Sequence, residues 1–175
     1  MKALIVSDSH GDSGIIRSLL NRYEYEAQLV IHLGDNVKDL MQFDSDYPGI
    51  NFVAVAGNCD YYTTIPNERI LTIGNSVKRQ VLLLHGHKLN VKSDYGRLIY
   101  YAQEKGVDAC LFGHTHTPFV HVHEPVFLVD GEEKPRRQLI MNPGSVSLPR
   151  GGSVASCALL CINDEGDITV EVIEI

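Results

Sequence analysis

Ten short apolar runs recur along the chain, and they constrain its fold more than any other feature. They read, in order, ALIVS, AQLVIHL, INFVAVA, ERILTIG, RQVLLLH, DACLFG, PVFLV, QLIMN, SCALLCI and ITVEVIEI. Runs of this length, rich in β-branched residues, are typical of β-strands. Gly74-Asn75 and the NDEG stretch at 163–166 separate neighbouring runs as hairpin turns do. We therefore expect a mixed sheet arrangement with antiparallel parts.

Two amphipathic segments lie among the strands. DSGIIRSLLNRY begins with Asp12 or Ser13 as a helix N-cap, and SDYGRLIYYAQEKG runs from a Ser93 cap to a stop at Gly106. Helices alternate with strands in the first two thirds of the chain, and strands alone follow. This order predicts an α/β fold, a four-layer αββα sandwich with two mixed sheets flanked by helices.

Length and composition predict the domain organisation and exclude several classes of protein. A chain of 175 residues without a dividing linker predicts a single domain over 1–175, and DGEEKPRRQ at 130–138 is typical of a solvated, charged turn. No apolar run approaches the roughly 18 residues of a membrane helix, and the first residues do not resemble a secretion signal. Four cysteines without a C-x-x-C pair suit a reducing cytoplasm. A net charge of −7 argues against an extended nucleic-acid footprint.

Five of the runs end in side chains that can bind metal ions. The residues that follow them are Asp8-Ser9-His10, Gly34-Asp35-Asn36, Gly57-Asn58-Cys59-Asp60, His85-Gly86-His87 and Gly113-His114-Thr115-His116. In layered α/β folds the loops at the carboxyl ends of strands converge on one edge, where sites assemble. Five such endings predict one shared site.

The residue types limit the chemistry of that site. Carboxylates, imidazoles and an amide suit manganese, iron or zinc, and the set is too large for one tetrahedral zinc ion. Two metal ions bridged by one carboxylate hold the attacking and leaving oxygens of an in-line phosphoryl displacement, and Asp35 is the natural bridge.

The ordered motifs D-x-H, G-D, G-N-x-D, H and G-H-x-H resemble those of the calcineurin-like metallophosphoesterases, and GNCD with the late NPGSVSLPR is similar to their small YfcE-type phosphodiesterase branch. The resemblance implies two divalent metal ions, manganese first, with iron, zinc or nickel as alternatives. It also implies hydrolysis of a small phosphate ester by a metal-bound hydroxide. The ligand set that it implies is Asp8, His10 and His116 on the first metal, Asn58, His85 and His114 on the second, and Asp35 between them.

The third motif departs from the family pattern. Many relatives have histidine where this chain has Cys59. Asn58, Cys59 and Asp60 are candidate catalytic residues, but the Cys59 thiol either donates a proton to the leaving group or only packs beside the site. Asp60 either orients a catalytic group or caps the following turn.

Other candidates lie outside the ligand set. In the 142–150 loop, Asn142, Gly144, Ser145 or Arg150 could contact substrate, and the Arg150 guanidinium matches phosphate best. We expect His32 to be a core or supporting residue and His87 to be a surface residue. The second i, i+2 pair, His121 and His123, lacks the preceding glycine and is expected at exposed strand positions.

Two alternatives to a phosphodiesterase stay open at this point. A non-catalytic protein-binding scaffold, similar to the retromer scaffold subunit, shares the fold but has lost ligands. A small-molecule phosphomonoesterase uses the same two ions. A homo-oligomer also stays open, since DYGRLIYYAQ carries several tyrosines that could serve a dimer.

Overall fold

Two five-stranded mixed sheets form the centre of the computed structural model, which describes residues 1–129 and 131–175. The first sheet has the strand order β12 (Ile168–Glu174), β11 (Ser156–Ile162), β1 (Lys2–Val6), β2 (Leu29–His32) and β3 (Asn51–Ala54). The second has the order β4 (Glu68–Ile73), β5 (Arg79–Leu84), β6 (Ala109–Leu111), β10 (Gln138–Pro143) and β7 (Pro118–His123). In each sheet three neighbouring strands are parallel and the other pairings are antiparallel.

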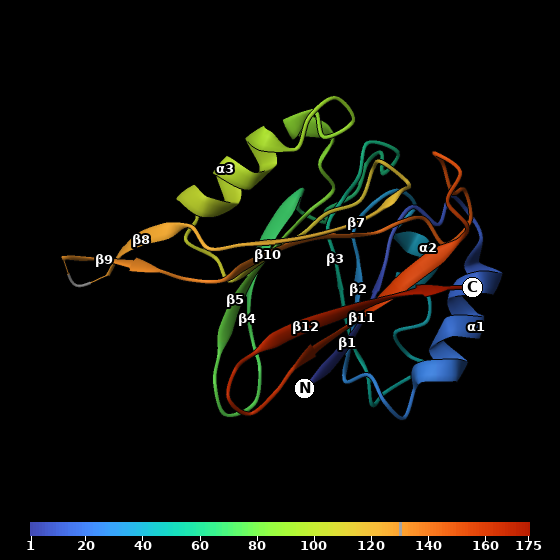
Figure 1. The fold of residues 1–175 in the computed structure, drawn as a ribbon. Helices are drawn as coiled ribbons and strands as arrows, with labels where there is room; N and C mark the ends of the chain where they lie inside the picture. Colours follow the sequence, from blue (N-terminus) through green and yellow to red (C-terminus); the bar gives the residue numbers. More distant parts are fainter. Residues whose placement is uncertain (130) are drawn as a thin grey trace.

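Helices cover the outer faces of both sheets (Figure 1). The helices α1 (Ser13–Tyr23) and α2 (Lys38–Met41) lie on the first sheet, whereas α3 (Gly96–Glu104) lies on the second, after the short 3₁₀ helix η1 (His87–Leu89). Strand alternation separates three apolar layers. Ile5 and Leu83 lie in the core between the sheets, whereas Leu4 packs towards α1 and Leu82 towards α3. The four-layer αββα prediction is confirmed.

Local expectations met different outcomes. The hairpins at 74–75 and 163–166 form as predicted, between β4 and β5 and between β11 and β12. Asp12 caps α1, since its Oδ1 accepts from the Ile15 amide at 3.0 Å. The Ser93 cap is wrong: α3 begins at Gly96, and the Ser93 hydroxyl instead donates to Asn90 Oδ1 at 3.4 Å within the preceding turn.

The prediction of a turn over 130–138 is also wrong in part. Residues Glu132–Pro135 form strand β9, which pairs with β8 (Val126–Val129) in a separate two-stranded hairpin. Charged residues form this strand because both of its faces are exposed, so charge carries no burial penalty there. The remainder of the predicted turn includes Asp130, which lies outside the described residues.

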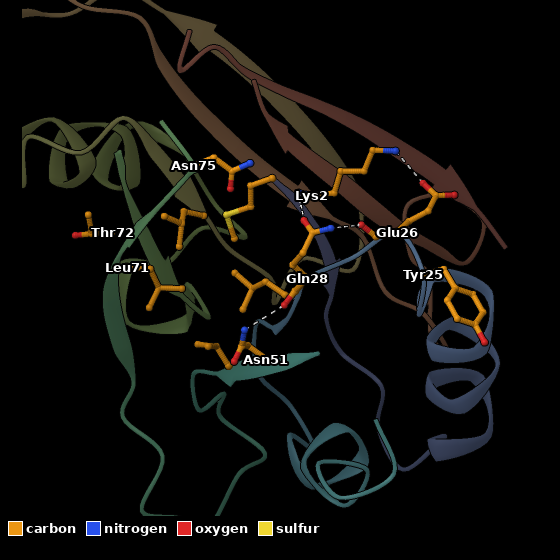
Figure 2. Close-up of a pocket in the computed structure, with 12 residues that line it drawn as sticks. Lys2, Tyr25, Glu26, Gln28, Asn51, Leu71, Thr72 and Asn75 are labelled. Atoms are coloured by element: carbon orange, nitrogen blue, oxygen red, sulfur yellow. Dashed lines mark hydrogen bonds and ion pairs between the residues drawn. The ribbon is translucent and has the colours of Figure 1, made fainter. Parts of the chain in front are cut away.

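The two ends of the sandwich differ in character. At the amino ends of β1, β2 and β3, a cavity of about 730 Å³ opens into the apolar layer between the sheets, next to β4 (Figure 2). Its described lining residues include none of the predicted metal ligands. Those ligands follow the carboxyl ends of β1, β2, β3, β5 and β6, at the opposite end. None of the helices in the described ranges is long and apolar enough to span a membrane.

Candidate metal centre

Six of the predicted ligands converge in two groups that share one carboxylate. In each group, every residue offers a donor atom, and these atoms lie within 4.8 Å of one another. The first group consists of Asp8, His10, Asp35 and His116, and the second consists of Asp35, His85 and His114. Asp35 is the member common to both, as expected of a bridge between two ions.

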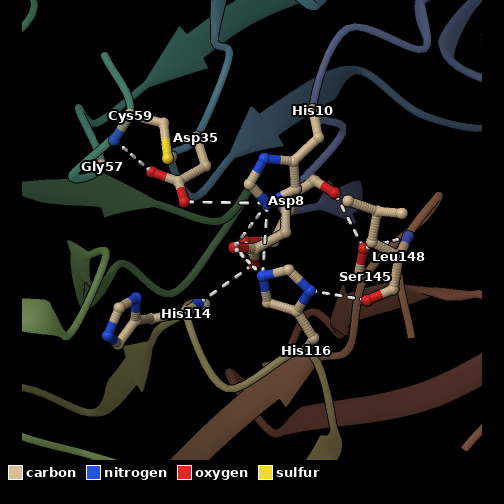
Figure 3. A network of polar contacts seen from close by, with 12 residues as sticks. Asp8, His10, Asp35, Gly57, Cys59, His114, His116, Ser145 and Leu148 are labelled. Carbon is tan, nitrogen blue, oxygen red and sulfur yellow. Dashed lines mark hydrogen bonds and ion pairs between the residues drawn. The ribbon is translucent and has the colours of Figure 1, made fainter. Parts of the chain in front are cut away.

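Asp8 lies at the centre of the first group (Figure 3). Its Oδ1 atom is 3.1 Å from His116 Nε2 and 3.9 Å from His10 Nε2. The two Nε2 atoms of His10 and His116 are themselves 3.2 Å apart. The second group adjoins it through Asp35, whose Oδ1 is 3.4 Å from His85 Nε2. Donor atoms of several side chains thus crowd a single small volume.

Backbone carbonyls orient two of the imidazoles. The Nδ1 atom of His85 lies 2.7 Å from the Leu33 carbonyl oxygen, and that of His116 lies 2.6 Å from the Leu148 carbonyl oxygen. A carbonyl oxygen can only accept, so Nδ1 carries a proton, and whenever the ring is neutral its lone pair is at Nε2. This is the tautomer that metal-binding histidines use.

Two buried atoms of the cluster have no hydrogen-bond partner among the described residues. They are Asp8 Oδ1 and His85 Nε2. Buried polar atoms without partners are costly, and native structures rarely leave them so without a reason. A cation between the carboxylates and the imidazoles would satisfy both atoms, so the residues present fit a divalent metal.

The backbone around these side chains is strained. Left-handed φ angles occur at five of the predicted ligands, at 55° for Asp8, 46° for His10, 64° for Asp35, 71° for His114 and 61° for His116. Such a conformation costs a residue other than glycine roughly 1–3 kcal/mol and is found mostly at functional sites. The sharp turns that it produces bring the side chains of successive loops to one point.

The charges of the cluster stabilise one another. Burial alone would raise the pKa of the Asp35 carboxyl, but the adjacent His85 imidazole and the Cys59 amide hold this pKa well below its usual range. Burial alone would lower the pKa of His85, but Asp35 and Asp8 together raise it. Burial, followed by the charge of His85, lowers the pKa of His114 to about 4, so this ring is neutral near pH 7.

The third motif contacts the site mainly through hydrogen bonds to backbone amides. The Asp60 carboxylate accepts from the amides of Asp35 and Gly57, each at 2.8 Å, and of Val37 at 2.9 Å. Asp60 therefore holds the Asp35 loop against its own loop, which favours the orienting role over the capping role. Gly57 lies so close that a Cβ atom there would collide with Asp35 Oδ1.

The other two residues of this motif are less integrated. The Cys59 amide donates to Asp35 Oδ1 at 2.8 Å, while burial and the Asp35 carboxylate raise the pKa of its thiol to about 11. Asn58 is exposed, and its side-chain amide donates to Cys59 Sγ at 3.3 Å. Among the described residues, no hydrogen bond joins the Asn58 side chain to the six converging ligands, so its role as a ligand stays a prediction.

The 142–150 segment holds two of the ligand loops by hydrogen bonds. Ser145 and Ser147 donate to the Asp8 carbonyl oxygen at 2.7 and 3.1 Å, and Asn142 donates to the Gly113 carbonyl oxygen at 2.8 Å. These contacts fix two of the ligand loops, a function that the sequence did not reveal. Arg150 is exposed, and its backbone amide donates to the His116 carbonyl oxygen at 3.1 Å.

The remaining histidines lie in three different surroundings. His32 is fully buried, and its Nε2 lies 3.0 Å from the Ser9 hydroxyl oxygen. His121 and His123 lie on β7, outside both groups. His87, expected at the surface, is instead half-buried, and its ring centroid lies 5.5 Å from that of His85 and 6.1 Å from that of His114.

Comparison with known proteins assigns the family. A sequence model of the calcineurin-like phosphoesterase superfamily domain matches residues 1–165. The chain belongs to this superfamily. A Bacillus subtilis protein named probable metallophosphoesterase YsnB is 33% identical, with 94% of this chain and 86% of the relative covered. The Escherichia coli phosphodiesterase YfcE is 27% identical, with 91% of this chain and 87% of the relative covered.

Solved structures agree with the fold. A predicted phosphoesterase from Streptococcus pneumoniae matches with a TM-score of 0.72 at 28% identity, over 99% of this chain and 88% of the other. Vps29 from Entamoeba histolytica, complexed with zinc, matches with a TM-score of 0.68 at 24% identity, over 99% of this chain and 98% of the other. The chain is thus a member of a metallophosphoesterase family whose fold occurs both in proteins named as phosphoesterases and in Vps29.

Proposed function

We propose that this protein is a metal-dependent phosphodiesterase that hydrolyses small phosphate esters at a dinuclear site. One observation carries the proposal: two groups of donor atoms share Asp35, and they contain two buried atoms without hydrogen-bond partners in the described residues. In the proposed assignment Asp8, His10 and His116 hold the first ion. His85, His114 and Asn58 hold the second, and Asp35 bridges the pair.

The charge of the site suits a phosphate ester. Two divalent ions with the carboxylates of Asp8 and Asp35 would leave a formal positive charge, inside a protein whose net charge is −7. When bound, the ions would activate water as the nucleophile and neutralise charge on the phosphoryl oxygens. Arg150, exposed at the rim, is proposed to contact a phosphate oxygen. The acidic surface elsewhere would not attract this substrate.

The protein's own residues supply orientation. The Leu33 and Leu148 carbonyls fix the lone pairs of His85 and His116, and Asp60 fixes the backbone of Asp35. With nitrogen and oxygen donors and no thiolate among the proposed ligands, manganese is the first choice of metal, and iron, zinc or nickel are the alternatives.

The test is an assay of the metal-reconstituted protein with matched aryl phosphate monoesters and diesters, beside the variants Asp35→Asn and His114→Ala. We expect manganese-dependent diester hydrolysis that exceeds monoester hydrolysis and that falls at least 100-fold in both variants. Activity that survives in both variants would refute the site assignment. A higher rate with the monoester would favour a phosphomonoesterase.

A second candidate is a non-catalytic scaffold, and the fold similarity to Vps29 favours it. Its discriminating result is metal binding by the purified protein without hydrolysis of any phosphate ester. The ligand set argues for catalysis over a scaffold that has lost ligands, because six of the seven proposed ligands converge in the described residues.

A further inference from the structure

A cavity of about 410 Å³ adjoins the candidate metal centre on the side of the second group. Part of its wall is the segment His85, Gly86 and His87, which follows β5 and includes a proposed ligand of the second ion. It is distinct from the larger cavity at the opposite end of the sandwich, because no residue lines both. Because His85 belongs to both the cavity wall and the second group, a bound group would lie beside the proposed metal centre.

The lining of this cavity is mostly apolar. Leu84, Leu89, Pro66 and the ring of Tyr101 supply aliphatic and aromatic surface. Small-molecule sites of a few hundred Å³ typically combine such walls with a few polar groups that set orientation. The volume and the apolar walls suit an aromatic group such as a phenyl ring or a nucleobase.

Opposite charges line this cavity, since Glu68 and Lys88 both belong to its wall. Glu68 lines the wall, where its carboxylate accepts from the Tyr101 hydroxyl at 2.8 Å and pairs with Lys105 at 3.5 Å. The carboxylate is already supplied with partners, and its charge offsets that of Lys88, so the cavity presents no net charge to a ligand. An uncharged occupant fits.

His87 connects the cavity to the metal centre. It lines the wall, and its ring lies beside the His85 and His114 rings, at the centroid distances given above. Its Nδ1 atom is buried and has no hydrogen-bond partner among the described residues. A polar atom in this state is expected to have a partner in the working protein.

We propose that this cavity binds an uncharged, planar organic group of the phosphate ester, with His87 as a hydrogen-bonding contact to it. The inference rests on the proposed function and deepens it, since it names the kind of ester that the site selects. The proposed ligands would hold the ions that bind the phosphoryl group, and the cavity distinguishes aryl or nucleoside esters from short alkyl esters. His87 is thus a specificity-determining residue.

The test compares two phosphonates that differ only in their organic group. Binding of phenylphosphonate and methylphosphonate to the manganese-loaded protein is measured by calorimetry and as competitive inhibition of aryl diester hydrolysis. We expect phenylphosphonate to bind at least tenfold more tightly. Leu89→Trp, which fills the cavity, should reduce this preference to less than twofold and leave methylphosphonate binding unchanged.

Three further measurements complete the experiment. His87→Ala should weaken phenylphosphonate binding several-fold, and His87→Gln, which keeps a hydrogen-bonding group, should restore part of the loss. Leu128→Trp, on an exposed residue of β8 outside the cavity and the metal centre, is the matched control and should keep the full preference. Circular dichroism of each variant verifies that it is folded.

The failures are distinguishable. Equal binding of both phosphonates by a protein that hydrolyses diesters would overturn the cavity assignment alone. A preference for phenylphosphonate that Leu89→Trp and His87→Ala both leave intact would also overturn it. If the manganese-loaded protein bound neither phosphonate and hydrolysed no ester, the proposed function would fail, and the cavity assignment with it.

Discussion

Replacing Asp60 with alanine tests whether a carboxylate outside the ligand set controls metal affinity. The substitution removes the acceptor of three backbone amides, those of Asp35, Val37 and Gly57, at 2.8–2.9 Å. A hydrogen bond to a charged acceptor contributes roughly 1.5–3 kcal/mol. Because Asp60 is half-exposed, water would replace part of this, and we expect a loss of about 3 kcal/mol in the free energy of unfolding. For a domain of this size that corresponds to a fall in Tm of roughly 6–12 °C.

The expected effect on function is separate from this loss of stability. Without Asp60 the strained backbone of Asp35 can relax, and the proposed bridging carboxylate leaves its position. Residues that support metal ligands typically change metal affinity about 10–100-fold. We expect manganese affinity, measured by calorimetry at a temperature where the variant is folded, to fall by that factor. Asp60→Asn, which keeps one carbonyl acceptor, should lie between the wild type and Asp60→Ala.

Asp108→Ala is the matched control for this experiment. Asp108 Oδ2 accepts from the Gln80 amide at 2.7 Å, at the amino end of β6 and so at the far end from the candidate centre. Its loss should lower Tm and leave manganese affinity unchanged. If both variants lowered Tm but neither changed manganese affinity, Asp60 would be a loop-stabilising residue only, and the positioning argument would be wrong.

Three other predictions concern the same centre. Gly57→Ala introduces a Cβ atom that collides with Asp35, so manganese affinity should fall at least tenfold in calorimetry, and an unchanged value would contradict the close approach. His114→Ala should abolish diester hydrolysis, whereas His121→Ala, in the other i, i+2 histidine pair, on β7, should leave kcat/KM within twofold. Equal losses in both variants would remove the distinction between the 114/116 and 121/123 pairs. Removal of metal by a chelator should abolish hydrolysis, and it should lower Tm by several degrees because a bound ligand stabilises the folded state. Added manganese should restore both. Activity that resists the chelator would contradict a metal-dependent reaction.

Sequence patterns predicted the fold where local signals and tertiary packing agree. Buried strands such as β1 and β5 are continuous apolar runs, so their existence and the metal-capable residues after them could be predicted. Strand β9 could not, since its charged residues gain nothing from burial and depend on pairing with β8. The Ser93 cap failed because α3 begins only at Gly96, and the Ser93 hydroxyl donates to Asn90 within the preceding turn.

The supporting contacts of the site lay beyond sequence reasoning. Asp60 and Asp35 are in different loops, and Ser145 reaches Asp8 across 137 positions of the chain. Nothing in a motif indicates which backbone amide a carboxylate will accept from, because that depends on how two loops pack. His87 shows the same limit: a surface position was expected because single histidines are usually unligated, whereas the fold places its ring beside the second group.

The left-handed backbone at the candidate ligands bears on how such a protein can change during evolution. At His10 and His114 glycine would adopt the observed φ angles more readily than histidine, relieving roughly 1–2 kcal/mol of strain at each position. Mutations that remove metal ligands need not damage the loops that carried them. A descendant that lost its chemistry could thus keep, or even gain, stability and retain a rigid surface of the same shape, available for recognition of another molecule.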